Sequence, residues 1–593
     1  MKKLILLTIL CCQLIAINSQ TEVRFVLDKE IPSLNDQQVG LRGSLAPLSW
    51  DQSKPMTKTD SGYTITLSFD HPNEVLEFKF VLFDNDASPN WESTPNRTIK
   101  LLAGVDTITK HIFDKEQVID LSQIPLLTPE QLKEDIALFK TMVLDVHPGT
   151  YRYQTSESIA HHLAELDSIC SQPISHTELF LALSKVAAAI QCDHTLVGPY
   201  NQSNLINSMI HYQKNKLPFT FKWIDSKMVI LENASESDLM KRGTIIESID
   251  GTPTSRILAS MIPYIAADGA TDGNRINKLE IEGYDFRYNF FDMYYPLIFP
   301  DEDQVIELEV SNSNGSSTKV SVNYITLDER FRILTDRYPE FPKNKDALWA
   351  FELLEDSIAL LTINSFGAFG WKALSFDYKI YLSDVFKQIE ESDIKHLIID
   401  IRKNNGGADE MAVELFSYLV AKPKPLERIG RTRYITFPES LKSYVQTWSD
   451  NPWYYELKPD NSKPIDGYYD FKEKQKARRS DKTLYKGNAY LLTSGANTSL
   501  AYYTASRFRL ENLGTIIGQE TGGNLRGING GTILFLRLPN SEIEVDFPIR
   551  GEFSLAEKPN GGVKPDVEVH YEQKNIAENR DLELEQALAL IKN

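Results

Sequence analysis

The sequence predicts a multidomain α/β protein in which a strand-rich segment, a helical segment and a mixed region precede a C-terminal α/β core. Its 593 residues suffice for about three to five domains of ordinary size. The hydrophobic content of 42% and the charged content of 24% are those of a chain that buries a core. Apolar residues repeat with a period of two up to about residue 116, follow a helical period over 128–190, and alternate between strand and helix patterns after about residue 345. The last pattern is typical of helices packed on a sheet.

Residues 1–19 have the pattern of a secretory signal peptide, with two lysines, the apolar run 4–17 and a short polar end. A membrane anchor is the alternative, but the run is shorter than the ~20 residues that span a bilayer. Lipidation at Cys11 is not expected, because Leu10 stands where a small residue is normally found. No other segment is long and apolar enough to cross a membrane. We therefore expect a soluble chain exported to the periplasm, the cell surface or the medium.

The chain is acidic, and this limits its partners. Its formal net charge is −19, and loss of the two leader lysines leaves 63 − 2 = 61 basic against 82 acidic residues, a net of −21. Such a surface repels phosphate groups, so neither nucleic acid nor an anionic membrane is expected as a partner. The ten histidines show no metal-ligand spacing, and the sequence predicts neither a metal ion nor a cofactor.

The segment 20–116 is predicted to be a small β-sandwich. Apolar and polar residues alternate in stretches such as 62–67 and 76–80, and residues typical of turns separate these stretches. Several short strands of this kind, with one apolar face each, are stable when two sheets cover each other.

The segments 117–200 and 205–330 are predicted to be helical and mixed, respectively. In the first, Thr128 precedes Pro129, which is the arrangement of an N-cap followed by proline at the first helical position. In the second, the stretch 243–251 reads as a strand between glycines.

Two cysteines follow the leader, Cys170 and Cys192. The helical patterns 157–170 and 177–190 predict an antiparallel hairpin with Cys170 beside its turn. Cys192 would lie at the far end, roughly 20 Å away at 1.5 Å per residue. This distance excludes a disulfide between them.

The segment 345–593 is predicted to be the α/β core. Its expected strands are 358–363, 397–401, 489–493 and 515–518, with helices between them. The stretch 436–485 is rich in Tyr, Trp, Pro and Lys and is expected to be an insertion or a lid.

The segment 397–407, LIIDIRKNNGG, joins a buried strand to a polar turn with two glycines. Gly406 and Gly407 let backbone N–H groups approach a ligand closely, which is how an oxyanion hole is built. Asp400 and Arg402 are expected to brace the turn rather than to contact substrate. The alternative is an ordinary strand followed by a Gly-Gly loop.

The segment 491–501, LLTSGANTSLA, predicts a second strand, a turn of small residues and a helix. Ser499 lies at the start of the helix, where free N–H groups and the positive end of the dipole are available. It is a candidate nucleophile, with the Leu500 N–H as an oxyanion donor. The alternative is that Ser499 or Thr498 is a helix N-cap.

Together with 517–523 and 561–566, these two segments form four ordered motifs that resemble the carboxyl-terminal processing peptidase family. This family includes tail-specific proteases, tricorn core peptidases and retinoid-binding protein repeats, and the resemblance covers about residues 125–572. It implies a ClpP/crotonase-like α/β peptidase core over 345–593 and a PDZ-like domain over 205–330. The helical part of such a peptidase would be 117–200.

The resemblance also implies catalytic roles. By the family's spacing Ser499 is the nucleophile. Tail-specific proteases have a lysine base where this chain has Asn524, and an amide cannot take a proton. The tricorn-like branch instead takes its base from a histidine after the helical part, which here is His194. A neutral imidazole is a suitable base near pH 7, whereas a structural histidine is the alternative.

The remaining members of the site follow from the same resemblance. The carboxylate that would orient the histidine is assigned to Glu557, with Glu552 and Glu520 as other options. Gly407, and next to it Gly406, would supply the second oxyanion donor. His147 is interpreted as structural, because it ends a helix before a proline.

The N-terminal segment resembles a starch-binding domain through stretches 43–51, 77–80 and 91–97. The resemblance implies a sugar site made of Trp50, Lys79 and Trp91, in which the rings stack on sugar faces and the lysine donates to hydroxyls. The partner would be an α-glucan or another glycan. The alternative is that the aromatic residues only maintain the fold of a spacer.

The leading hypothesis is therefore an exported serine peptidase that acts on a peptide or protein and is targeted to glycan by its N-terminal domain. The alternative is a non-catalytic protein that binds peptide, lipid or glycan on a peptidase scaffold.

Overall fold

The computed structural model describes the chain in two compact units, Met1–Gln117 and Val118–Asn593. The described residues are 21–28, 37–59, 61–71, 74–84, 89–92, 96–101, 107–111, 113, 121–199, 201–282, 289–301, 303–311, 317–339, 349–355, 357–367, 376–425, 427–448, 451–471 and 480–592. The predicted signal peptide, 1–19, lies outside them. Among the described residues, none of the helices combines the length and apolarity that a membrane crossing needs.

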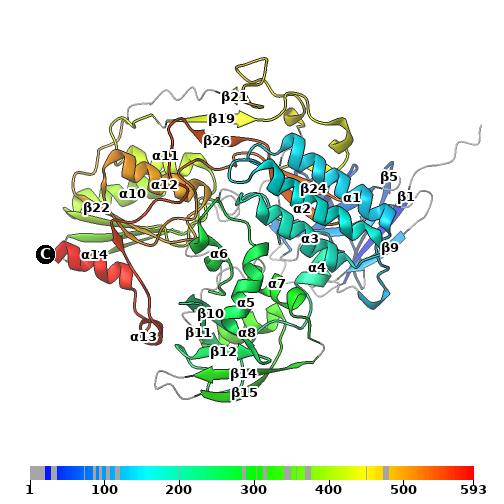
Figure 1. The fold of residues 1–593 in the computed structure, drawn as a ribbon, viewed down its shortest axis with the longest axis horizontal. Helices are drawn as coiled ribbons and strands as arrows, with labels where there is room; N and C mark the ends of the chain where they lie inside the picture. The colour runs from blue at the N-terminus through cyan, green and yellow to red at the C-terminus, as the bar shows by residue number, and fades with distance from the viewer. Residues whose placement is uncertain are drawn as a thin grey trace, which may run out of the picture. The chain divides into compact units, whose positions relative to one another are not determined.

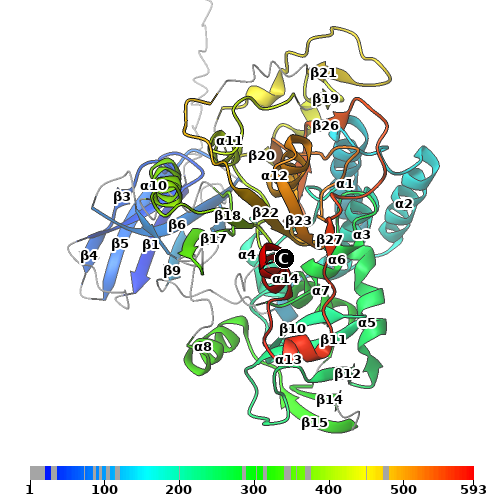
Figure 2. The same cartoon turned by 90° about the vertical axis from the view of Figure 1, so that its left-hand side faces the viewer.

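The first unit consists of two sheets that share one hydrophobic core (Figure 2). One sheet has the order β4-β5-β1-β9, and the other has the order β3-β2-β6-β7 with β8 also paired to β6. In β1 every second residue is buried, and Phe25 lies 4.9 Å from Phe78 of β6 between ring centroids. The predicted strands 62–67 and 76–80 are confirmed as parts of β5 and β6. The bounds are β1 Thr21–Asp28, β2 Gln38–Gly43, β3 Lys54–Pro55, β4 Thr57–Thr59, β5 Gly62–Phe69, β6 Val75–Phe83, β7 Asn90–Trp91, β8 Arg97–Lys100 and β9 Thr107–His111.

The second unit begins with helices. Thr128 caps α1, because its hydroxyl accepts from the Gln131 N–H while the Gln131 side chain accepts from the Thr128 N–H, and Pro129 is the first helical residue. The predicted hairpin is confirmed as α2 and α3, and Cys170 and Cys192 are both free and buried. The bounds are η1 Leu121–Gln123, α1 Pro129–Thr141, η2 Met142–Val146, α2 Ser156–Ser168, η3 Ile169–Ser171, α3 His176–Ala189 and α4 Asn204–Ile210.

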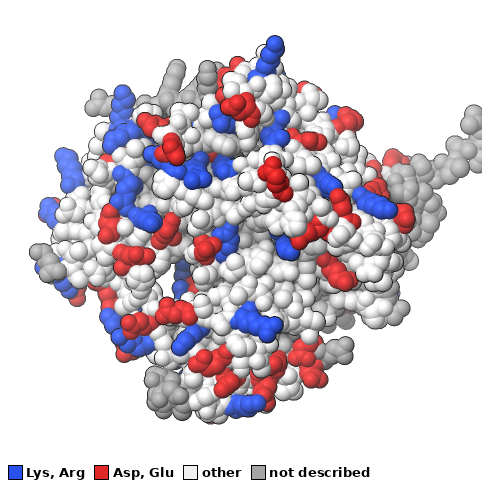
Figure 3. Space-filling model, in the orientation of Figure 1, with Lys and Arg blue, Asp and Glu red and all other residues white. Residues whose placement is uncertain are grey.

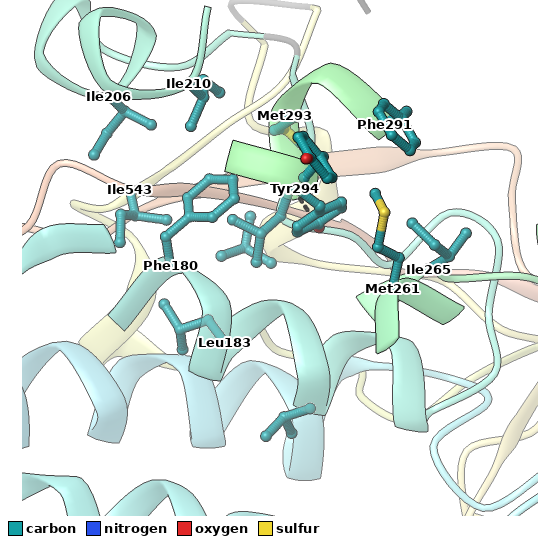
Figure 4. Close-up of a cluster of buried hydrophobic side chains, with 14 of the residues drawn as sticks. Phe180, Leu183, Ile206, Ile210, Met261, Ile265, Phe291, Met293, Tyr294 and Ile543 are labelled. Atoms are coloured by element: carbon teal, nitrogen blue, oxygen red, sulfur yellow. Dashed lines mark hydrogen bonds between the residues drawn. The ribbon is translucent and has the colours of Figure 1, made fainter. Parts of the chain in front are cut away.

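A mixed region follows, with a sheet of order β10-β11-β12-β14-β15 and the short β13 on β12. Figure 4 shows Tyr294 of α7 beside Phe180 of α3, and their ring centroids are 6.1 Å apart, so the helical segment and the mixed region share one core. The bounds are β10 Phe219–Ile224, β11 Lys227–Asn233, β12 Ile245–Ile249, β13 Thr252–Pro253, α5 Thr254–Met261, η4 Ile262–Tyr264, α6 Asp272–Lys278, α7 Phe290–Ile298, β14 Val305–Ser311, β15 Ser317–Asn323 and α8 Leu327–Arg337.

A buried ion pair fixes α8 to α7. Arg330 has no exposed surface, donates to the Leu217 carbonyl oxygen and to Asp292 Oδ1 at 3.0 and 3.1 Å, and also pairs with Asp292 Oδ2. Removing one member of such a pair leaves a buried charge without its partner. We expect Arg330→Met to lower the free energy of unfolding by about 3–5 kcal/mol in urea titrations. The exposed Arg332 of the same helix provides the control, and a loss below about 1 kcal/mol in Arg330→Met would contradict the expectation.

The C-terminal core is one sheet of order β16-β17-β18-β22-β23-β27, parallel from β17 onward. Figure 1 shows α10, α11 and α12 on one face and α14 on the other. Leu397 and Ile399 of β18 join the core under the first three helices, whereas Ile398 joins the core under α14. Because both faces are covered, the strand reads as a continuous apolar run. The four predicted strands are confirmed. The bounds are β16 Trp349–Leu353, β17 Ile358–Ile363, α10 Tyr378–Glu391, β18 His396–Asp400, α11 Asp409–Ser417, β22 Asn488–Thr493, α12 Ser499–Glu511, β23 Gly514–Gly518, β27 Val567–Glu568, α13 Gln573–Ala577 and α14 Leu582–Lys592.

Two small sheets, β21-β19-β26 and β20-β24-β25, connect this core to the helical segment. Asp546 of β25 forms a bridge with Leu196, and Phe547 lies 5.6 Å from Phe139 of α1 between ring centroids. The described parts of the predicted insertion 436–485 supply β20, β21 and two short helices to this junction. The bounds are β19 Arg428–Thr432, η7 Glu439–Leu441, β20 Val445–Gln446, η8 Trp453–Tyr455, β21 Tyr469–Phe471, β24 Ile533–Arg537, β25 Glu544–Pro548 and β26 Gly551–Ser554.

Candidate active site

Ser499 lies at the turn between β22 and α12 with an unusual backbone conformation. Its φ is +48°, in the left-handed region that residues with a Cβ rarely occupy. Thr498 takes the N-cap position, but its side chain makes no capping hydrogen bond to the helix. The N-cap alternative therefore does not account for this turn. A serine on a strained strand-to-helix turn is typical of exposed nucleophiles.

Side-chain hydrogen bonds hold this turn against the Gly-Gly turn that follows β18. Asn497 donates through Nδ2 to the carbonyl oxygens of Ile401 at 2.5 Å and Asn404 at 2.9 Å. The Thr498 hydroxyl lies 3.1 Å from the Asn405 carbonyl oxygen. The two segments that the sequence singled out are thus neighbours, although they are more than 90 residues apart.

The glycines of the turn have different functions in this contact. Gly406 has φ +118°, and a Cβ on it would lie 2.7 Å from Ser499 Cβ and 3.0 Å from the Leu500 nitrogen. A side chain at Gly406 would therefore fill the space in front of Ser499. The Gly406 N–H donates to Asn404 Oδ1 at 2.9 Å, so it is not available to a ligand.

The N–H groups of Gly407 and Leu500 have no acceptor among the residues that the structure describes. Gly407 has φ +136° and forms a parallel bridge with Phe366, whose carbonyl oxygen would lie 2.0 Å from a Cβ on Gly407. The Leu500 N–H belongs to the first turn of α12, where no helical acceptor exists. These two groups are the candidate oxyanion donors.

Asp400 and Arg402 brace the turn, as predicted. Arg402 donates to both oxygens of Asp400 at 3.0 and 2.7 Å. It also donates to Asp581 at 2.6 and 2.9 Å and to Glu583 at 3.0 Å, at the start of α14. The Gly-Gly turn is therefore fixed to the opposite face of the sheet.

His194 lies in a loop that a second histidine holds in place. His147 is buried, and its Nδ1 accepts from the Gly149 N–H at 3.1 Å. Its Nε2 therefore carries the proton and donates to the Thr195 hydroxyl at 2.7 Å. Burial, followed by the charges of two arginines, lowers the pKa of His147 to about 3, so it stays neutral. The structural interpretation of His147 agrees with these contacts.

The His194 ring packs on Gly530. A Cβ on Gly530 would lie 3.4 to 3.7 Å from three ring atoms. Burial lowers the pKa of His194 below its ordinary value, and the charge of Asp193 only partly opposes this. The imidazole is therefore neutral at pH 7, as a general base must be.

Two aspartates surround His194. One ring nitrogen of His194 and one carboxylate oxygen each of Asp193 and Asp268 lie within 4.8 Å of one another. Asp193 pairs with Lys278, and its N–H donates to Asp268 Oδ1 at 3.1 Å. His194 Nδ1 and Asp268 Oδ2 are both buried and have no hydrogen-bond partner among the described residues.

The two aspartates differ in charge. Burial raises the pKa of Asp193, but Lys278, His194 and hydrogen bonds outweigh it, so this carboxyl ionises below its ordinary range. Burial, and then the charge of Asp193, raises the pKa of Asp268 to about 8. At neutral pH the pair therefore carries one negative charge, on Asp193.

The His194 loop and the Ser499 turn are in contact. The Thr498 side chain is near enough to the Asp193 carboxylate to help lower the pKa of that group, after the larger effects of Lys278 and His194. Asn524 donates through Nδ2 to the Asp268 carbonyl oxygen at 3.1 Å. Asp193 and Thr498 are the sequence neighbours of His194 and Ser499, so the His194 loop and the Ser499 turn lie close to each other.

Residues 357–569 match the sequence profile of peptidase family S41. This part of the chain is thus similar to peptidase family S41. The prediction of a carboxyl-terminal processing type of peptidase is thereby confirmed, and with it the class of serine-type peptidase. The matched range contains Gly406, Gly407 and Ser499, whereas His194 lies outside it.

Two solved structures of mature CPAF share the fold of this chain. Mature CPAF complexed with lactacystin has a TM-score of 0.53 at 14% identity, with 78% of this chain and 98% of that chain covered. A second structure of mature CPAF has a TM-score of 0.51 at 14% identity, with coverages of 76% and 94%. The photosystem II D1 C-terminal processing protease has a TM-score of 0.35 at 11% identity, with coverages of 74% and 93%.

The carboxylates assigned from the sequence lie elsewhere. Glu557 is exposed, and no contact between it and His194 occurs among the described residues. Glu520 Oε1 accepts from the Gly562 N–H at 2.6 Å, and Glu552 pairs with two arginines. Asp193 and Asp268 are the described carboxylates beside His194. Asp193 could have been noticed as a sequence neighbour of His194, whereas nothing in the local sequence distinguishes Asp268.

The trio of His194, Asp193 and Asp268 is also the arrangement among the described residues that could offer three ligands to a metal ion. A cation there would have to compete with the Lys278 ammonium group for Asp193.

Proposed function

We propose that the chain is an exported serine peptidase in which Ser499 is the nucleophile and His194 is the base. The observation that carries this proposal is the strained backbone of Ser499 in front of Gly406, where only a glycine leaves room for a reacting carbonyl group. The N–H groups of Gly407 and Leu500 point to an oxyanion hole beside it.

In the proposed mechanism, His194 takes the proton of the Ser499 hydroxyl while the oxygen attacks the peptide carbonyl carbon. The Gly407 and Leu500 N–H groups bind the carbonyl oxygen as it becomes negative. The imidazolium then gives its proton to the leaving amine, and the acyl group stays on Ser499. Water, deprotonated by His194, releases the acid product by the same steps.

We propose Asp268, in place of the Glu557 that the sequence suggested, as the residue that positions His194. Its Oδ2 and the His194 Nδ1 are both buried and both lack a partner, so a small side-chain movement on substrate binding would join them. Ionised Asp268 would hold the imidazole in one tautomer and stabilise the imidazolium.

This assignment predicts how the rate depends on pH. The pKa of Asp268 is about 8, so the group is protonated at pH 7 and ionised above pH 8. Asp193, Lys278, Arg152 and His194 are the charged or titratable groups that influence it. We expect kcat/KM of the natural chain to rise as the pH passes through about 8. The Asp268→Asn variant should lack this rise, and at pH 9 its kcat/KM should be at least ~100-fold lower than that of the natural chain.

The Glu557→Gln variant is the matched control for Asp268→Asn. We expect its pH profile to follow that of the natural chain, because Glu557 is exposed. If Glu557→Gln loses activity while Asp268→Asn is unaffected at pH 9, then Glu557 rather than Asp268 is the carboxylate that positions His194.

Serine-directed labelling tests the proposed function itself. A fluorophosphonate should form a covalent adduct that maps to the peptide containing Ser499, and the same sample should hydrolyse denatured casein or a peptide library. A non-catalytic protein on a peptidase scaffold would show neither adduct nor hydrolysis.

A second candidate function, glycan binding, is proposed for the first unit. The Trp50 and Trp91 rings lie 6.0 Å apart at an angle of 47°, and Trp91 is 39% exposed. Lys79 Nζ lies 3.4 Å from the carbonyl oxygen of Glu92, which is the residue after Trp91. Two tilted rings with a lysine are suited to the curved apolar face of an α-glucan.

Affinity chromatography tests this second function. We expect Trp50→Ala and Trp91→Ala each to abolish retention of the full chain on immobilised starch, because each removes one stacking face. Trp448→Ala is the control, since Trp448 is an exposed tryptophan (61%) of the second unit. Equal retention of all variants, or no retention of the natural chain, would contradict glycan binding at this pair.

We further propose that the mixed region 205–330 is a PDZ-like domain. The order of its sheet and the strand β12 between Gly243 and Gly251 are consistent with this assignment.

A further inference from the structure

Arg152 is a partly buried arginine that the proposed mechanism does not use. Its three guanidinium nitrogens are buried and have no hydrogen-bond partner among the described residues. Burying a guanidinium group without an acceptor is unfavourable, because five N–H donors lose water and gain nothing. The neighbouring Tyr153 senses the Arg152 charge, but it donates its own proton to the Gly527 carbonyl oxygen at 3.1 Å.

The guanidinium group of Arg152 stacks on an aromatic ring instead of pairing with a carboxylate. Its central carbon lies 3.9 Å from the centre of the Phe553 ring. A Cβ on Gly551 would lie 2.9 Å from Arg152 Nη2, so the missing side chain at Gly551 leaves room for the group. Such stacking positions an arginine but leaves its planar N–H edge for a carboxylate.

Arg152 lies close to His194, the proposed base. Gly551 forms a bridge with Asn529, and the next residue, Gly530, packs under the His194 ring. The Arg152 guanidinium group therefore lies near the His194 loop, which Gly530 contacts.

Arg152 belongs to a group of arginines in and around the sheet β21-β19-β26, which we call the arginine wall. Each of its guanidinium groups covers an aromatic ring at 3.9 to 5.5 Å from the centroid. Two carboxylates pair with members of the wall, Glu552 and Asp470. Five arginines and two carboxylates leave 5 − 2 = 3 positive charges in a chain whose net charge is −19. The members are Arg152, Arg428, Arg431, Arg433 and Arg550.

Packing against aromatic rings does not by itself explain where the arginine wall lies. The Arg428 guanidinium lies 4.3 Å from the Tyr503 ring centre, one helical turn after Ser499 on α12. The wall therefore reaches from the nucleophile helix to Arg152, near the His194 loop. Figure 3 shows basic side chains over the region where Figure 1 places β19, β26 and α12, and acidic side chains over β14 and β15.

We propose that Arg152 binds a carboxylate of the peptide substrate, so that the peptidase prefers acidic or carboxylate-ended peptides. This inference rests on the proposed function and names the substrate class of the same site. The carboxylate would come from an Asp or Glu side chain or from the C-terminus of the substrate, and both would form two parallel hydrogen bonds with the guanidinium edge.

Matched fluorogenic peptides test the proposal. One series replaces Glu by Gln at each of the three positions on either side of the scissile bond, and a second replaces a free C-terminus by an amide. We expect the natural chain to prefer the charged member of at least one pair by tenfold or more in kcat/KM. We expect Arg152→Gln to reduce that ratio to about one, and 0.5 M NaCl to reduce it in the natural chain. The series in which the preference occurs identifies the source of the carboxylate.

Arg431→Gln is the matched control, because Arg431 stacks on the same Phe553 ring but already pairs with Asp470 at 3.1 Å. We expect it to keep most of the preference. Equal ratios in the natural chain and in Arg152→Gln, or an equal loss in Arg431→Gln, would overturn the assignment to Arg152.

Two further measurements separate this proposal from the proposed function and from misfolding. Fluorophosphonate labelling of Ser499 in Arg152→Gln shows that the site is intact. Arg152→Lys keeps the positive charge but not the planar edge, so a partial ratio of a few fold is expected. If the natural chain is neither labelled nor active on any peptide, the proposed function fails. If it is active without preference, only the carboxylate site fails.

Discussion

Ser499→Ala should lower kcat/KM by roughly four to six orders of magnitude, because the other groups of a serine peptidase site give only residual catalysis without the nucleophile. Fluorophosphonate labelling should disappear in the same variant. Binding of a peptide product should persist, since the oxyanion donors and the Gly-Gly turn are unchanged. Steady-state hydrolysis of one fluorogenic peptide, with active-site titration, measures the effect.

The strained backbone of Ser499 gives this experiment a second readout. The residue has φ +48°, where a glycine has no steric penalty. Ser499→Gly should therefore be inactive and more stable than the natural chain by about 1 kcal/mol. Ser506→Ala, on the same helix two turns later, should change neither property. Full activity in Ser499→Ala would remove the nucleophile assignment, and lower stability in Ser499→Gly would show that the turn is not strained.

The parts of this fold that the sequence predicted are those in which local pattern decides structure. The run 397–399 is apolar at every position because helices cover both faces of the sheet, so its strand could be identified from composition alone. The Gly406-Gly407 turn stands out by its local pattern, whereas the assignment of Ser499 as nucleophile comes from the resemblance to the peptidase family and stays a prediction. Local pattern helps in both, because the chemistry requires particular residues within a few positions of one another.

The carboxylates could not be identified in this way. Asp268 reaches His194 through a hydrogen bond to Asp193 that spans 75 residues, and no periodicity connects the two. Asn524 is a second residue whose contacts could not be predicted from the local sequence pattern. It was recognised as unable to act as a base, but its contact with the Asp268 carbonyl oxygen spans 256 residues. Side chains that converge from remote segments depend on tertiary packing, which a local pattern does not encode.

Gly407→Ala should disable the oxyanion hole without touching either catalytic side chain. Gly407 has φ +136°, and a Cβ on it would lie 2.0 Å from the Phe366 carbonyl oxygen. The turn must therefore move, and with it the Gly407 N–H that we assign to the oxyanion. Loss of one such donor costs about 100- to 1,000-fold in kcat, which corresponds to roughly 3–4 kcal/mol.

The design of this test depends on separating backbone strain from the loss of the donor. Gly251→Ala introduces the same kind of strain, because Gly251 has φ +74°, but no atom lies within 4 Å of its added Cβ. Both variants should lose stability, and only Gly407→Ala should lose kcat. Since the Ser499 hydroxyl and His194 are unchanged, Gly407→Ala should still react with a fluorophosphonate, at a lower rate. Equal kcat in the two glycine variants would mean that the second donor comes from another N–H group and that the Gly-Gly turn serves only to make room for Ser499.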